Sequence, residues 1–192
     1  MPDSVVLPNV LTHYYRPFSR PLLSLSALSE QELLGVLEGL ARQEPLPYRL
    51  TDPAYLSERR RLERLMRHQF ETKGGRPERE FPHYFVLGEF SLWESDGSSR
   101  VQIPLRTVES VAVSFTLTDS FFNYRRHNLR GVEIPLRPYH GQLFALEELP
   151  AQLALHGLPG EAWRFHPERR FDVYVEAQIW SDEPVRHLLA TA

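Results

Sequence analysis

The hydrophobic pattern of this chain changes once, near residue 80, from a helical period to an alternating one. Apolar residues recur every third or fourth position across residues 53–72, as on a helix, and every second position across residues 111–117, as on a strand. Early helices followed by late strands predict the α+β class. We therefore expect N-terminal helices packed on a mostly antiparallel, twisted sheet.

Two helices are expected before this change. Ser29 and Glu32 have the spacing of a capping box, in which each side chain binds the other residue's backbone amide. This predicts a helix over residues 30–42. Asp52, followed by proline at the first helical position, predicts a second helix over residues 53–72.

The expected strands share an alternation of apolar and polar residues between turn signals. The clearest covers residues 171–180, in which Tyr174, Glu176, Gln178 and Trp180 project from one face. The remaining strand candidates cover residues 5–15, 81–87, 101–105, 111–117, 132–136 and 143–146, and a short helix is expected over residues 147–156.

Composition excludes several classes of protein. The 192 residues suit one domain, so we expect residues 1–192 to form a single one. The absence of cysteine excludes disulfides and thiolate chemistry and suits a cytoplasmic location. Residues 1–8 lack the basic and apolar parts of a signal peptide, and no apolar run reaches membrane-spanning length. The histidines show no metal-ligand spacing, so no metal site is predicted.

The face of the last expected strand is the first candidate site. Tyr174, Glu176, Gln178 and Trp180 combine large aromatic rings with a carboxylate. An aromatic face suggests packing, whereas a carboxylate needs water or a partner, and a partly closed cleft satisfies both. The alternative is a solvent-exposed face with scattered aromatic residues.

His13, between aromatic neighbours on an extended segment, is the second candidate. Its imidazole can bind a ligand hydroxyl while Tyr14 or Tyr15 stacks on a flat group. The alternative is a half-buried histidine bound to a backbone carbonyl.

The second helix and the loop after it form the third candidate, a basic region. Residues 58–80 carry eight basic and five acidic side chains, a net charge of +3. A phosphate-binding surface for nucleic acid or a nucleotide is one interpretation, with residues 73–77 as the contact loop. A solvated helix face with internal ion pairs is the other. The net charge of −3 supplies no general attraction to nucleic acid or membrane.

Several segments together resemble a family of small bacterial proteins without an assigned activity. The segments cover residues 7–15, 73–77, 82–88, 113–116 and 176–183. This resemblance implies one bacterial cytoplasmic domain.

The order of three residues also resembles the ADP-ribosyltransferase fold. That fold carries a histidine or arginine on its first strand, an aromatic residue on a middle strand and a glutamate on a late strand. The resemblance implies that His13 holds the nicotinamide ribose, that Tyr84 stacks on nicotinamide, and that Glu176 stabilises positive charge at the ribose carbon. NAD is then the implied cofactor, contacted by Tyr14, Tyr15, Tyr174 and Gln178.

Three hypotheses for function follow. The first is an ADP-ribosyltransferase-like domain that binds NAD and modifies an unknown acceptor, and it requires His13, Tyr84 and Glu176 to converge on one cleft. The second is a non-enzymatic binding protein of the immunity or adaptor type, with an exposed apolar patch. The third is a nucleic-acid binder that acts through the arginine-rich helix over residues 53–72.

Overall fold

The core of the protein is a six-stranded sheet in the order β3-β1-β2-β6-β4-β5, and every neighbouring pair in it is antiparallel. A computed structural model describes residues 5–46, 50, 52–125 and 133–190 of the chain. The strands are β1 (Val10–Tyr15), β2 (His83–Leu87), β3 (Ser99–Pro104), β4 (Val113–Thr116), β5 (Phe144–Ala145) and β6 (Glu176–Ile179). The predicted α+β class is therefore confirmed.

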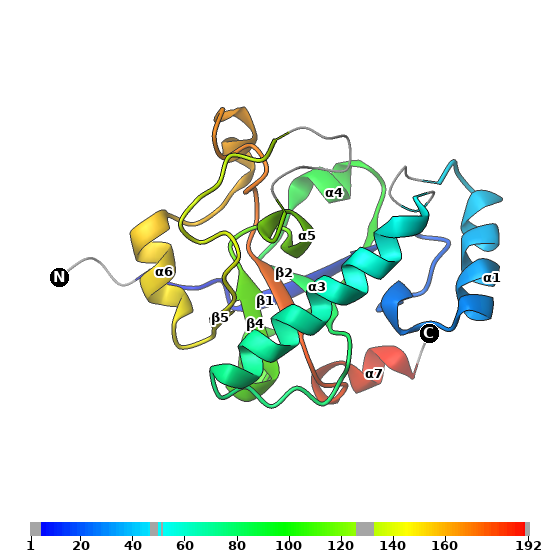
Figure 1. Ribbon diagram of the computed structural model, residues 1–192, viewed down its shortest axis with the longest axis horizontal. Helices are drawn as coiled ribbons and strands as arrows, with labels where there is room; N and C mark the ends of the chain where they lie inside the picture. The colour runs from blue at the N-terminus through cyan, green and yellow to red at the C-terminus, as the bar shows by residue number, and fades with distance from the viewer. Residues whose placement is uncertain (1–4, 47–49, 51, 126–132, 191–192) are drawn as a thin grey trace.

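The helices lie around this sheet (Figure 1). The α-helices are α1 (Glu30–Ala41), α3 (Pro53–Thr72), α4 (Ser91–Ser95), α5 (Ser120–Asn123), α6 (Leu149–His156) and α7 (Arg186–Leu189). Short 3-10 turns are η1 (Leu25–Ala27), η2 (Leu105–Thr107), η3 (Ser110–Ala112), η4 (Glu161–Phe165) and η5 (Glu183–Val185).

Both predicted N-terminal helices form, and both begin at the predicted caps. The Ser29 hydroxyl accepts from the Glu32 amide, and the Glu32 carboxylate accepts from the Ser29 amide. The Asp52 carboxylate accepts a hydrogen bond from the Ala54 amide. Local capping chemistry therefore determines where α1 and α3 start.

The last strand is shorter than predicted, because regular pairing starts only at Glu176. The residues before it form a turn, in which the Asp172 amide donates to the Arg169 carbonyl. Asp172 is fully buried and accepts a hydrogen bond from the Tyr139 hydroxyl at 2.5 Å. The segment expected over residues 132–136 was also wrong as a strand: residue 132 lies outside the described residues, and residues 133–136 make a single bridge.

Different elements pack against the two faces of the sheet. α3 crosses one face, where Met66 and Phe70 pack against Trp180. The opposite face carries the main apolar core, which includes Phe85 and Ile179 and is covered in part by α6. α1 lies to the side, near the start of α3, and buries none of its residues (Figure 1).

Candidate functional site

Glu176, the first residue of β6, is a buried carboxyl group on the α3 face of the sheet. Its side chain is 7% exposed, and its Oε1 accepts hydrogen bonds from the Ser120 amide at 3.1 Å and the Gln178 amide group at 3.0 Å. Burial and the nearby charge of Asp119 raise the pKa of Glu176 to about 8. Most molecules therefore hold this carboxyl protonated at neutral pH.

Hydrogen bonds between side chains of β4 and β6 hold the Glu176 carboxyl group in place. Gln178 lies opposite Ser114 in the β4–β6 register. The Gln178 carbonyl accepts from the Ser114 hydroxyl at 3.0 Å, and its amide group donates to Thr116 and to Glu176. Gln178 is fully buried and makes its hydrogen bonds inside the protein. It therefore orients Glu176, whereas the sequence predicted that it would contact a cofactor.

Asp119 is the second carboxyl group of the site. It begins α5, where its Oδ1 accepts from the Phe121 amide at 2.8 Å. Its Oδ2 accepts from the Tyr174 hydroxyl at 3.0 Å. The Tyr174 ring also packs against Trp93, with ring centroids 5.0 Å apart. Tyr174 thus holds Asp119 and forms one wall of the site.

α3 contributes a buried ion pair next to these carboxyl groups. Glu63 is 1% exposed, and its Oε1 accepts from Arg59 at 3.1 Å and from the Tyr84 hydroxyl at 2.9 Å. The Arg59 guanidinium also lies 4.4 Å from the centre of the Tyr84 ring. One face of Tyr84, the ring predicted to stack on nicotinamide, is therefore occupied by Arg59.

These groups surround a cavity of about 340 Å³. Arg59, Asp119 and Glu176 contribute a guanidinium and two carboxyl groups to its lining. Its walls are largely aromatic, with smaller contributions from His13, Leu23, Ser24, Leu25 and Leu50; the aromatic residues are Tyr14, Tyr55, Tyr84, Trp93, Phe121, Phe122 and Tyr174. We call this space the Glu176 cavity.

His13 borders the cavity but cannot act in it as predicted. Its Nδ1 lies 2.7 Å from the Tyr84 carbonyl oxygen, and its Nε2 accepts from the Leu22 amide at 3.0 Å. Burial lowers the pKa of His13 to about 4, so the ring is neutral and donates through Nδ1. Both nitrogens bind backbone, which is the alternative that the sequence left open.

The strand register also separates His13 from Glu176. Thr12 lies opposite Val86, and Val86 lies opposite Glu176, so these three side chains share one face. His13 follows Thr12 and projects to the other face, where its ring lies 5.5 Å from that of Phe85. His13, Tyr84 and Glu176 all line the Glu176 cavity, but the His13 ring projects to the other face of the sheet and both its nitrogens are bound to backbone groups.

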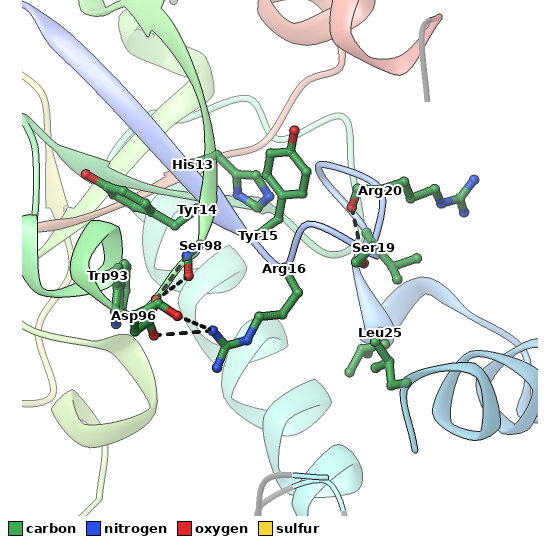
Figure 2. Close-up of a pocket in the computed structure, with 12 residues that line it drawn as sticks. His13, Tyr14, Tyr15, Arg16, Ser19, Arg20, Leu25, Trp93, Asp96 and Ser98 are labelled. Carbon is green, nitrogen blue, oxygen red and sulfur yellow. Dashed lines mark hydrogen bonds and ion pairs between the residues drawn. The ribbon is translucent and has the colours of Figure 1, made fainter. Parts of the chain in front are cut away.

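Tyr14 and Tyr15, which follow His13 in β1, also lie on opposite faces of the sheet. Tyr14 lies on the Glu176 face, where its hydroxyl accepts from the Phe90 amide at 2.8 Å and its ring contacts Trp93. Tyr15 stacks on His13, with ring centroids 6.0 Å apart, and lines a neighbouring cavity (Figure 2). Only Tyr14 of the two is placed to contact a ligand beside Glu176.

Sequence reasoning placed Arg59 and Glu63 in the basic region of residues 58–80 and did not connect them, or Asp119, with Glu176. Glu63 carried a usable signal, since it interrupts the apolar stripe of α3 between Leu62 and Met66. A charged residue on a buried stripe needs a partner, and Arg59 lies four residues earlier.

The arginines of α3 are bound within the protein. Arg59, Arg61, Arg64 and Arg67 pair with Glu63, Glu58, Glu80 and Glu71 respectively, and Arg60 donates to the carbonyls of Ser26 and Leu28. In the loop that follows, Lys73 pairs with Glu148. This arrangement matches the solvated face with internal ion pairs and gives no support to a nucleic-acid surface.

No family model, curated protein or solved structure matches the chain. Within the described part of the chain, no helix is both long and apolar enough to cross a membrane. No group of three or more histidine, aspartate or glutamate side chains that could hold a metal occurs among the same residues.

Proposed function

We propose that the chain binds a small ring-containing molecule in the Glu176 cavity and that Glu176 takes part in its chemistry, as a general acid when the leaving group needs a proton and as a carboxylate when the ligand is a cation. The observation that carries this proposal is a carboxyl group with its pKa raised to about 8, beside a second carboxyl group, in a cavity with aromatic walls. Carboxyl groups with shifted pKa values in concave sites are typical of acid–base catalysis.

The two carboxyl groups suit different tasks. Glu176, protonated at neutral pH, can donate its proton to a leaving group. Asp119 accepts hydrogen bonds from Tyr174 and from the Phe121 amide, an arrangement that suits a carboxylate. A carboxylate in this position stabilises positive charge that develops on the ligand. Arg59, next to both, can bind a negative group of the same ligand.

The walls of the cavity favour a flat or sugar-like ring. Tyr14, Trp93 and Tyr174 offer aromatic surface on which such a ring can pack. A nucleoside with a cationic base fits this environment best, because its positive charge favours loss of the Glu176 proton. Toward such a ligand Glu176 acts as a carboxylate that stabilises positive charge, and the base leaves as a neutral molecule without taking a proton. In its most specific form the ligand is NAD and the reaction is transfer of ADP-ribose to an unknown acceptor in a bacterial cytoplasm. Glu176 and the aromatic walls would hold the nicotinamide riboside half, and His13 would have no part.

Thermal unfolding with added ligand tests the proposal. A ligand at about 100 times its Kd stabilises the folded state by about 2.7 kcal/mol, which raises Tm by roughly 5 to 10 °C for a domain of this size. We expect NAD to produce such a rise and slow release of nicotinamide, and Glu176→Gln to abolish the release. Glu109→Gln, at an exposed position, is the matched control. Wild-type protein that shows neither stabilisation by NAD nor by any member of a nucleoside and sugar panel would contradict the proposal.

A further inference from the structure

A second, smaller cavity of about 180 Å³ is lined by His83, whose side chain lies on the opposite face of the sheet from Glu176. Leu23 and Ser24 line both this cavity and the Glu176 cavity. It is bounded by the loop that leads into η1, by the first residue of β2 and by Leu189 of α7. Its polar lining consists of Arg20, Ser24, Arg79 and His83. No acidic side chain lines it among the described residues. We call it the His83 cavity.

His83 has one ring nitrogen without a partner. Its side chain is 2% exposed, and its Nε2 lies 2.8 Å from Asp182 Oδ1. Its Nδ1 is buried and makes no hydrogen bond of ordinary geometry within the described structure, although the Leu22 backbone lies close enough to raise the pKa of the ring. A buried polar atom in this state is costly, and a bound ligand is one way to satisfy it. Burial and the nearby Arg79 guanidinium lower the pKa of His83, which disfavours the doubly protonated ring in the free protein. Asp182 opposes this shift, and a bound anion would add to its effect, so that Nδ1 carries a proton and donates it to the anion.

Two arginines supply the positive charge of this cavity. Arg79 donates to the Phe81 carbonyl at 2.9 Å and pairs with Asp182, which leaves its guanidinium fixed at the cavity. Arg20 is exposed, and Figure 2 shows its side chain extending away from the ion pair between Arg16 and Asp96. A fixed guanidinium and an exposed one together suit the recognition of an oxyanion.

The loop over the His83 cavity is held in a strained conformation. Leu22 has a φ of 60°, a left-handed value that a branched side chain rarely adopts. The Leu22 amide is held by His13 Nε2, whose other nitrogen binds the Tyr84 carbonyl. Strain that the surrounding structure maintains is typical of ligand-binding loops. His13 thus acts as a positioning residue for this loop.

From these features we propose that the His83 cavity binds a small oxyanion, such as sulfate, phosphate or the anionic group of a larger ligand. His83 Nδ1–H, Arg79 and Arg20 are its donors, and Asp182 holds the His83 ring from behind. None of these four side chains takes part in the chemistry proposed for Glu176.

Sulfate is the best probe, because its charge does not change between pH 6 and 8. We expect saturable binding by calorimetry and a change in the His83 ring resonances that is larger than that of His68, an exposed histidine on α3. Binding should strengthen from pH 8 to pH 6, since His83 must carry a second proton while it faces Asp182, Arg79, Arg20 and His13. Arg20→Ala should weaken binding roughly three- to tenfold, the range of one charged hydrogen bond with partial exposure.

Two controls make the test specific. Arg16→Ala removes a cation that pairs with Glu44 and Asp96 outside the His83 cavity, so sulfate affinity should not change. Glu176→Gln should also leave sulfate affinity unchanged, which separates this proposal from the one for Glu176. The proposal is overturned by the absence of saturable sulfate binding, or by binding that leaves the His83 resonances unmoved or that Arg20→Ala does not weaken.

Discussion

The two faces of the sheet each bury an ionisable side chain from a strand, and they use it differently. On one face, Glu176 accepts bonds from neutral donors and faces a cavity with a second carboxyl group. On the other, both nitrogens of His13 bind backbone groups. A buried ionisable group whose bonding capacity is used by backbone supports the fold. One that faces a cavity with a shifted pKa is a candidate for chemistry.

The largest expected difference between the faces lies in their dependence on pH. The pKa of Glu176 is raised from 4.5 to about 8 on folding, so the unfolded state loses this proton first as pH rises. The folded state should lose stability between about pH 4.5 and 8, by at most about 5 kcal/mol at about 1.4 kcal/mol per pKa unit. Urea unfolding at several pH values measures this loss. Glu176→Gln should remove it, and an unchanged slope in that variant would contradict the assignment.

Glu63 lies on the same face as Glu176 but differs from it, because its carboxylate is paired with the Arg59 guanidinium. Glu63→Ala leaves Arg59 largely buried without its counter-charge, and we expect a loss of about 3 to 4 kcal/mol in the free energy of unfolding. Glu58→Ala is the matched control, since Glu58 pairs with Arg61 on the exposed side of α3 and should change stability by less than about 0.5 kcal/mol. Equal losses in the two variants would show that burial of the pair has no role.

His13 should give the opposite pH dependence. Its pKa falls from 6.5 to about 4 on folding, so its contribution is complete above pH 6.5 and is lost as pH falls toward 4. The expected loss is about 3 kcal/mol at about 1.4 kcal/mol per pKa unit. His13→Phe should flatten the acid side of the stability profile while NAD still stabilises the variant. Loss of ligand binding in a folded His13→Phe protein would show that His13 takes part in binding at the Glu176 cavity.

The smallest effect is expected on the outer side of α3. Arg64 and Glu80 form an exposed pair with 3.9 Å between their charged atoms. Arg64→Ala should change the free energy of unfolding by less than about 0.5 kcal/mol and should not alter binding to an oligonucleotide. A salt-sensitive loss of oligonucleotide binding in this variant would revive the nucleic-acid hypothesis.

The sequence predicted those features that depend on near neighbours. Capping residues located the starts of α1 and α3, and alternation placed Glu176 and Gln178 on one face of a strand. The partners of His13 were out of reach, because the Tyr84 carbonyl lies 71 residues away in the chain. Asp119 was missed for the same reason, since its partner Tyr174 is 55 residues distant. The register of the strands determines which candidate site residues lie side by side, and composition does not reveal that register.

The most direct test of the account is the titration of the Glu176 carboxyl group itself. Carbon NMR of the side-chain carboxyl, assigned by its absence in Glu176→Gln, gives this pKa in the free protein. The account predicts a midpoint near 8 that falls when a cationic ligand binds. A midpoint near the ordinary glutamate value of about 4.3, unmoved by ligand, would contradict it.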